Sequence, residues 1–254
     1  SATASVALAR VHGSEAGASF DILARFESED TRSHAEVMAP FAHAALQEAG
    51  VRGEELDAIL TGTGPGPFTG LRAGIVTARA LGFAWSVPVY GMMSLTALAE
   101  RAYQERVFAQ GGGAGEAEGA ELLVASDARR REVYSARYRV NAEGYSLVDG
   151  PTVSPASEIL PGEGPSYAYG YGAGLYAETL RELGWDLVEA GEGIHPHAEY
   201  LLAAAARRGL DALSPDTSAL YLRDSDAKIP AAMLARQQKQ AARATAQTVG
   251  QREG

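Results

Sequence analysis

Apolar and polar residues alternate along several short stretches of the chain, as they do in β-strands. Residues 5–11 and 20–26 show this pattern on either side of a Gly-containing turn at 12–17, which predicts a β-hairpin. Residues 121–125 and 132–140 predict a second strand pair, joined by a turn that begins at Asp127. A further short strand is expected at 58–60.

Other stretches repeat their apolar residues at intervals of three and four, as helices do. The stretch 35–49 predicts a helix, with Ser33 as its N-cap and Glu36 as the capping-box partner, and Pro40 predicts a kink or a late start. Three more helices are expected: from residue 71 to just before Pro88, near residues 95–101, and from 198 to 208. Strands and helices that alternate in this way predict an α/β fold.

A glycine-rich loop at 63–70 joins the strand at 58–60 to the helix that follows. Glycines permit close backbone approach, and the first amides of a helix favour an anion. We therefore assign the loop residues as phosphate-proximal candidates: Gly64, Gly66, Thr69, Gly70 and Arg72. The loop lacks the Lys-Ser/Thr ending of a P-loop and the GxGxxG spacing, so a tight turn without a ligand remains the alternative.

Two helices carry rows of small residues, which allow close approach of helix axes. We predict that these helices dock on another protein, and the expected interface consists of Met38, Ala42, Ala45, Leu71, Gly74, Ile75 and Ala78. The alternative is that both rows pack only on this chain's own sheet.

The 254 residues are 46% hydrophobic and include no cysteine, which excludes thiolate catalysis and Cys-based metal sites. The net charge of −10 argues against a dominant role in holding nucleic acid. The apolar stretches are too short for a membrane helix. The Gly-rich run 109–119 reads as a linker, so we expect an N-terminal subdomain at 1–108, a C-terminal subdomain at 120–235 and a polar tail at 236–254.

Few residues suggest chemistry. No Gly-x-Ser-x-Gly elbow is present, and the pair His195 and His197 lacks an evident third ligand, so we predict no catalytic residue and no metal site. The basic cluster 129–131 is interpreted either as a solvated turn or as a phosphate contact.

Longer motifs resemble one protein family. The string Gly64-Pro65-Gly66-Pro67-Phe68-Thr69-Gly70-Leu71-Arg72, with its flanks from 56 to 95, closely resembles the TsaB family, also known as YeaZ. The likeness continues at 33–36, 127–134 and 220–227 and covers most of the chain.

The resemblance implies an actin-like (ASKHA, RNase H-like) tandem of two α/β subdomains. It implies a cytoplasmic, non-catalytic scaffold and activator that pairs with a TsaD-type catalytic subunit and supports binding of a TsaE-type ATPase. Together these proteins form threonylcarbamoyladenosine in tRNA, so the chain is expected to meet tRNA only indirectly. It also implies no cofactor of its own, with weak ATP or ADP binding at the shared interface left open.

The chain departs from the family pattern at two points. In the family, an apolar strand ending in Asp-Thr precedes the point where this sequence begins, so the first strand is expected to be missing. TsaD-like relatives carry a His-x-x-x-His metal pair where this chain has His34 and Met38. Two alternatives remain: an independent actin-like nucleotide hydrolase or peptidase, and a stand-alone homodimer built on the same helices.

Overall fold

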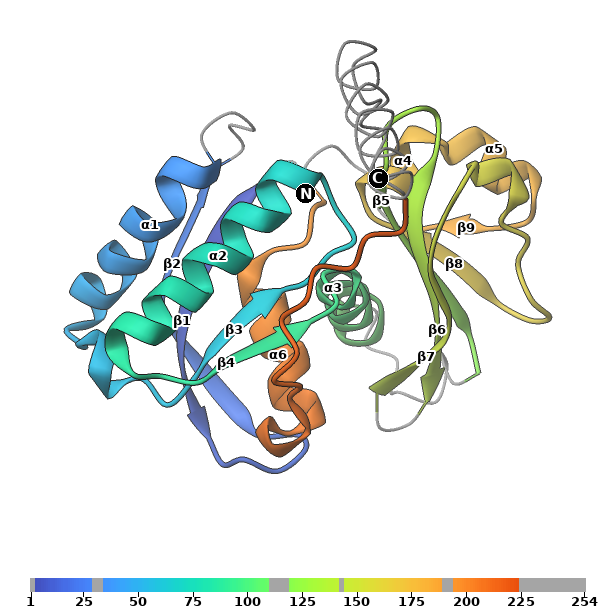
Figure 1. The fold of residues 1–254 in the computed structure, drawn as a ribbon. Helices are drawn as coiled ribbons and strands as arrows, with labels where there is room; N and C mark the ends of the chain where they lie inside the picture. The colour runs from blue at the N-terminus through green and yellow to red at the C-terminus, as the bar shows by residue number, and fades with distance from the viewer. Residues whose placement is uncertain (1–2, 29–33, 110–118, 142–143, 189–193, 224–254) are drawn as a thin grey trace, which may run out of the picture. The chain divides into compact units, whose positions relative to one another are not determined.

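The described part of the chain contains three β-sheets, six α-helices and three short 3-10 helices (Figure 1). The computed structural model describes residues 3–28, 34–109, 119–141, 144–188 and 194–223. Residues Ser1–Leu222 form one compact unit, to which everything below refers. The predicted N-cap Ser33, the tail 236–254 and nearly all of the predicted linker lie outside the described residues, and those predictions remain untested.

The chain begins with the predicted hairpin. Strands β1 (Ala4–His12) and β2 (Ser19–Ser28) pair antiparallel, with a register shift between Leu8 and Ala9, which confirms the hairpin. Helix α1 (His34–Ala49) follows and contacts both strands. The helix includes Pro40 within its length, so it does not start after the proline.

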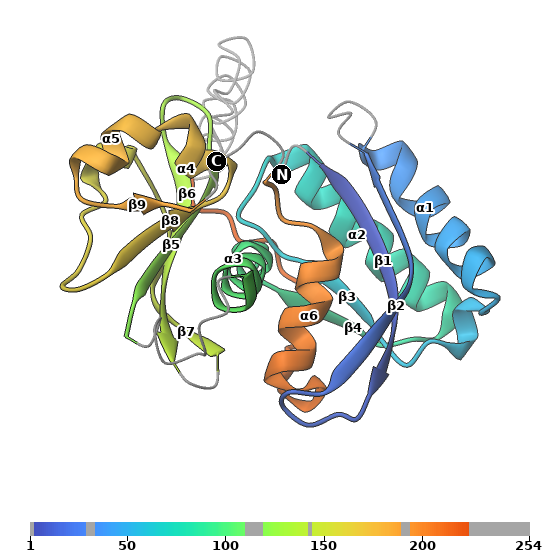
Figure 2. The ribbon, with the colours of Figure 1, turned by 180° about the vertical axis from the view of Figure 1, so that it is seen from behind.

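A parallel strand pair comes next. Strand β3 (Ile59–Gly62) is followed by α2 (Phe68–Trp85) and then by β4 (Val89–Met92), which pairs parallel with β3. Helix α2 contacts β3, β4 and α1. Helices α1 and α2 therefore cover one face of the two strand pairs, while α6 (Ala198–Arg208) covers the opposite face (Figures 1 and 2).

The second half of the chain forms a five-stranded mixed sheet in the order β7-β6-β5-β8-β9. Its strands and short helices follow the chain: β5 (Glu121–Asp127), β6 (Val133–Asn141), β7 (Gly144–Ser154), β8 (Ser166–Tyr169), α4 (Tyr171–Leu175), α5 (Ala177–Glu182) and β9 (Asp186–Leu187). Strands β5 and β6 pair antiparallel around Asp127, which confirms the predicted second strand pair.

Strand β5, in the middle of this sheet, is buried on both faces. Leu122 and Val124 on β5 pack in a cluster with α3 (Leu95–Ala109), whereas Leu123 and Ala125 face α4 and α5 in another cluster. This alternation follows from the period of two in a strand. A third cluster joins α3 to α6, so α3 lies between the two halves.

The end of the described chain returns to the first half. Helix α6, at the residues predicted for it, contacts β1, β2 and β3 as well as α3, and Ser214 forms an isolated bridge with Gly91 on β4. The boundary predicted at 109–119 places these residues in the C-terminal subdomain. Their contacts tie them instead to the elements of residues 1–108, because the apolar face of α6 packs against α3 and β3. The position of the subdomain boundary remains a prediction.

A buried ion pair joins α6 to α3. The fully buried Glu100 on α3 accepts hydrogen bonds from Arg207 Nε at 2.8 Å and Arg207 Nη2 at 2.6 Å. Tyr145 and Gln104 donate to the same carboxylate, at 2.9 Å and 2.8 Å. Hydrogen bonding to Glu100 raises the pKa of Arg207, and burial, followed by the charge of Glu100, raises the pKa of Tyr145.

Candidate functional site

The glycine-rich loop lies between β3 and α2, as the sequence predicts. Gly64 has φ of 95°, a conformation that favours glycine, and an added Cβ would lie 2.8 Å from Leu71 Cδ2. The amide of Gly64 donates to Ser94 Oγ at 2.9 Å, and its carbonyl accepts from the Ser94 amide at 2.7 Å. Packing within the chain therefore accounts for Gly64 without a ligand.

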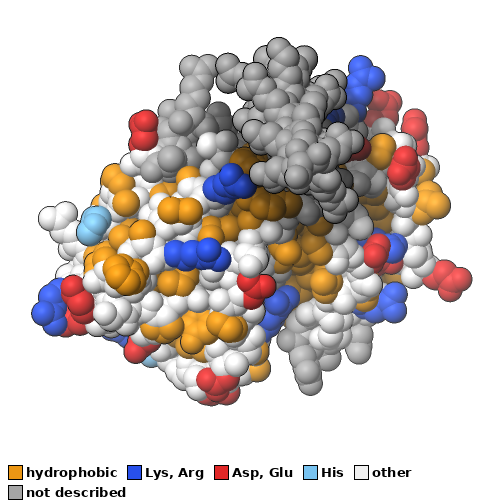
Figure 3. Space-filling view, in the orientation of Figure 1, with side chains coloured by type: hydrophobic (Ala, Val, Ile, Leu, Met, Phe, Trp, Pro, Cys, Tyr) orange, Lys and Arg blue, Asp and Glu red, His pale blue; other side chains and the backbone are white. Residues whose placement is uncertain are grey.

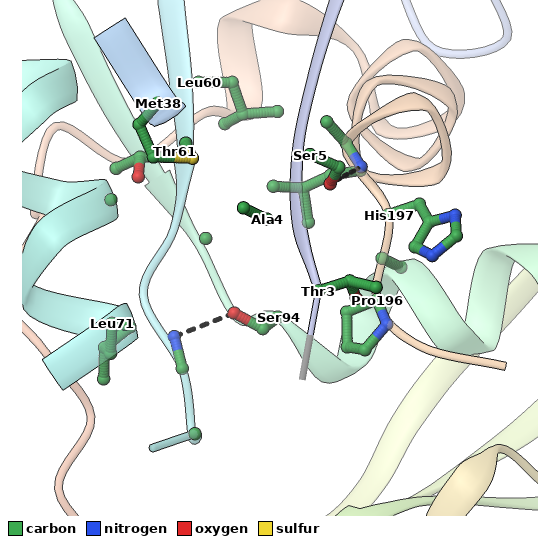
Figure 4. Close-up of a pocket in the computed structure, with 18 of the residues that line it drawn as sticks. Thr3, Ala4, Ser5, Met38, Leu60, Thr61, Leu71, Ser94, Pro196 and His197 are labelled. Atoms are coloured by element: carbon green, nitrogen blue, oxygen red, sulfur yellow. Dashed lines mark hydrogen bonds between the residues drawn. The ribbon is translucent and has the colours of Figure 1, made fainter. Parts of the chain in front are cut away.

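A pocket of about 150 Å³ opens beside this loop (Figure 4). The start of β1 and the end of β3 border it from opposite sides. Among the described strands, β1 pairs only with β2 and β3 only with β4, so both unpaired edges face the pocket. The expectation of a missing first strand remains a prediction.

The pocket has little capacity to hold a phosphate. Its lining includes the predicted loop residues Gly64, Gly66 and Gly70, but Thr69 and Arg72 are not part of it. Within the described part of the chain, the lining contains no Lys or Arg. The Ser94 hydroxyl is used by Gly64, and Ser5 Oγ accepts from the Ala198 amide at 2.9 Å. These two hydroxyls are therefore already bonded, and among the described lining residues the side chain that can carry a positive charge is His197.

Arg72 contacts an aromatic pair outside the pocket. Its Nε donates to Tyr221 Oη at 2.8 Å, and its guanidinium carbon lies 3.5 Å from the centre of the Phe68 ring. Among the described residues, no ion pair includes Arg72. Arg72 is the fifth residue of α2, so it lies near the positive end of the helix dipole. The Phe68 ring and the neutral Tyr221 hydroxyl contact its guanidinium there.

The predicted interface residues lie mostly inside the chain. Ala45, Leu71, Ile75 and Ala78 are buried, because this face of α1 and α2 is turned toward the strands and toward the neighbouring helix. The other three, Met38, Ala42 and Gly74, are half-buried. In this structure, a partner cannot reach the four buried side chains.

The solvent-facing side of α2 carries large apolar side chains instead. Phe68 is 49% exposed, Val76 is 63% exposed and Phe83 is 90% exposed. Sequence reasoning followed the small residues and missed these three. The signal was present, since positions 68, 76 and 83 fall on one side of a helix that also has a buried apolar side.

The basic turn between β5 and β6 projects its side chains into solvent. Arg129, Arg130 and Arg131 are exposed and have φ values of 61°, 56° and 65°, in the left-handed region. Asp127 accepts from the amide of Arg129 at 2.7 Å and lies 3.1 Å from its guanidinium. The charge of Arg129 is therefore paired within the chain, and the phosphate contact remains a prediction.

The histidine pair is built into the structure. His195 is buried and packs against Tyr171 with the ring centres 4.8 Å apart and the ring planes tilted by 43°, and burial lowers its pKa to about 4. His197 Nδ1 lies 3.3 Å from Glu27. The described residues contain no group of three His, Cys, Asp or Glu side chains placed to hold a metal ion.

Among the helices that the structure describes, none is long and apolar enough to cross a membrane.

Comparison with known proteins gives consistent matches. A family model described as "TsaD: tRNA N6-adenosine threonylcarbamoyltransferase" matches residues 21–170. An uncharacterized protein of Mycobacterium tuberculosis is 43% identical over 133 residues, which are 52% of this chain and 54% of that protein. The chain spans about half the length of the mycobacterial relatives that it matches.

Two further matches carry family names. The "tRNA threonylcarbamoyladenosine biosynthesis protein TsaB" of Escherichia coli is 28% identical over 211 residues, covering 78% of this chain and 85% of that protein. A Pseudomonas aeruginosa crystal structure, described as similar to peptidase YEAZ, matches with a TM-score of 0.66 and 29% identity, covering 85% of this chain and 99% of that chain. The fold is therefore the mixed α/β fold of the YeaZ structures, and the chain belongs to the TsaD family, within its TsaB (YeaZ) group.

Proposed function

We propose that this chain is a non-catalytic scaffold and activator in the formation of threonylcarbamoyladenosine in tRNA. In this role it forms a heterodimer with a TsaD-type catalytic subunit and supports a TsaE-type ATPase. The proposal extends to this chain the role that the name of the E. coli relative states. The proposal also includes the fold, in which the two halves of the chain are the two α/β subdomains of an actin-like tandem.

The observation that carries the proposal is the exposed apolar face of α2. Phe83, at 90% exposure, and Val76, at 63%, point away from the chain's own core. Large apolar side chains gathered on one helix face mark a protein contact rather than a free surface. The contact is proposed for this outer face of α2, whereas Met38 and Gly74 line the pocket on its inner side.

The chemistry of the glycine loop supports an accessory role. Its pocket has no Lys or Arg among the described lining residues, and packing within the chain accounts for Gly64. We therefore assign the chemical step and most contact with tRNA to the partner. Weak ATP or ADP binding is proposed only for the assembled interface, where a partner supplies cations.

The test is complex formation with the TsaD-type subunit of the same organism, measured by size-exclusion chromatography with light scattering. The wild-type chain is expected to form a 1:1 heterodimer. Replacing Val76 and Phe83 with Ser should weaken the heterodimer while the melting temperature is kept, because both side chains are exposed. No heterodimer at micromolar concentrations, or ATP hydrolysis by the chain alone, would favour a homodimer or an independent hydrolase.

A further inference from the structure

Five exposed residues form a single row along the outer face of α2. They are spaced by four, four, three and four positions, so they lie on one side of the helix: Phe68, Arg72, Val76, Arg79 and Phe83. Apolar and basic side chains alternate in this row. Lys and Arg side chains lie among hydrophobic ones over the region of α2 (Figure 3).

Both arginines of the row are held by one segment of the chain, residues 214–222, which we call the strap. Arg72 Nε donates to Tyr221 Oη at 2.8 Å, and Arg79 Nε donates to Thr217 Oγ1 at 2.7 Å. Thr217 is 6% exposed, so its hydroxyl is a fixed acceptor. The two contacts are alike in geometry and in chemistry, since each fixes the Nε side of a guanidinium with a neutral oxygen.

The strap itself is anchored on the strands. The amide of Leu220 donates to the carbonyl of Thr63 at 2.8 Å, directly after β3, and the amide of Gly91 donates to the carbonyl of Ser214 at 2.9 Å. An added Cβ on Gly91 would lie 2.1 Å from the carbonyl oxygen of Asp216. The strap therefore packs tightly on β3 and β4 and provides a rigid base for both arginines.

Neither arginine has its charge neutralised by these contacts. Within the described part of the chain, neither takes part in an ion pair, and the hydroxyl partners are neutral. Asp216 is on the strap, but its pKa is lowered chiefly by Ser218, and the charge of Arg79 is the smallest cause. Each guanidinium is a planar fork that pairs with a carboxylate through two parallel hydrogen bonds, which uses the terminal amino groups.

We propose that Arg72 and Arg79 form a two-point clamp for carboxylates on a helix of the catalytic partner. Residues seven apart lie about 10.5 Å apart along a helix axis. The partner helix is therefore expected to present two Asp or Glu side chains two turns apart, with apolar residues that pack on Phe68, Val76 and Phe83. The inference rests on the proposed function, because it specifies the chemistry of the proposed docking face.

The sequence of α2 argues for a different protein rather than a second copy. Residues Phe68–Trp85 contain no Asp or Glu. A symmetric pairing of two α2 helices would bring like charges together, which is unfavourable at a desolvated contact. Charge complementarity is met instead by an acidic partner helix.

The experiment measures the affinity of the chain for its TsaD-type subunit by calorimetry at low and high salt. The variant pair is Arg72→Met with Arg79→Met, which keeps the apolar stems and removes the charge. The matched control is Arg181→Met, an exposed arginine near the end of α5. The clamp predicts an affinity loss of about tenfold or more at low salt for the double variant, a flatter salt dependence, and no change for the control.

Charge reversal at the two arginines is a more stringent test of the clamp. Arg72→Glu with Arg79→Glu should abolish binding, and reversing two acidic residues of the partner that lie seven apart should restore it. Double variants that bind as tightly as wild type, with the same salt dependence, would overturn the clamp while leaving the proposed function intact. A wild-type chain that does not bind the subunit would refute the proposed function itself.

Discussion

Removing Arg207 is expected to destabilise the fold strongly. Its guanidinium makes two hydrogen bonds to Glu100, whose side chain is fully buried. Loss of one partner from a buried ion pair typically costs about 3–5 kcal/mol, because the remaining charge stays buried. Tyr145 and Gln104 still donate to the carboxylate, so Arg207→Met should fall at the lower end, at about 3 kcal/mol.

This loss corresponds to a fall in melting temperature of about 6–12 °C, at roughly 2–4 °C per kcal/mol for a chain of this size. Differential scanning calorimetry measures it, supported by urea unfolding. Arg208→Met is the matched control, since Arg208 is adjacent and exposed, and should change stability by less than about 0.5 kcal/mol.

A double-mutant cycle isolates the pair. Adding Glu100→Gln to Arg207→Met removes the stranded charge, so the double variant should lose less stability than the sum of the single variants, by about 1–3 kcal/mol. If Arg207→Met melts within about 2 °C of wild type, or if the two single losses simply add, the ion pair does not hold α6 to α3 as argued.

Three further outcomes are expected. Gly64→Ala should lower the free energy of unfolding by about 1–2 kcal/mol, because it strains a residue in the left-handed conformation and crowds Leu71. Gly74→Ala has open space at its added Cβ and should raise the free energy of unfolding by up to about 1 kcal/mol. Urea unfolding compares the two variants, and equal effects would contradict this prediction. His195 has a pKa of about 4 in the folded chain, below its value in the unfolded chain. As the pH drops from about 6.5 toward 4, the unfolded chain therefore binds a proton at this residue before the folded chain does, and the free energy of unfolding should fall. A His195→Gln variant whose unfolding has the same pH profile as wild type would disprove this. Phe83→Ser should leave the melting temperature within about 2 °C of wild type yet weaken the heterodimer, and chromatography at limiting concentration detects the loss.

Local patterns in the sequence were sufficient for most elements. The alternation at 5–11 and 20–26 predicted the hairpin, and the helix at 198–208 was found at the expected residues. These signals are short-range, since period and turn chemistry act within a few residues. Position in space is different: α6 returns to β1 and β3 through contacts between residues nearly two hundred apart, such as Ala198 with Ser5.

The candidate site was predicted only in part, because short-range signals locate its loop but do not show which helix faces are buried. The loop and its glycines were placed correctly, but the direction of each helix face was not, because a row of small residues fits a buried face as well as an interface. Burial of Ile75 and exposure of Phe83 distinguish the two faces only in the folded chain. The partner of Arg72 was also missed, since Tyr221 lies 149 residues away and is brought near by the strap.

The most direct measurement is threonylcarbamoyladenosine formation on tRNA with purified proteins, with threonylcarbamoyl-adenylate supplied. The TsaD-type subunit, the TsaE-type ATPase and this chain are assayed together and then with each omitted. This chain alone is expected to transfer nothing and to hydrolyse no ATP, and omitting it is expected to abolish multiple turnover by the other two proteins. Transfer or ATP hydrolysis by this chain alone, or full activity without it, would contradict the account.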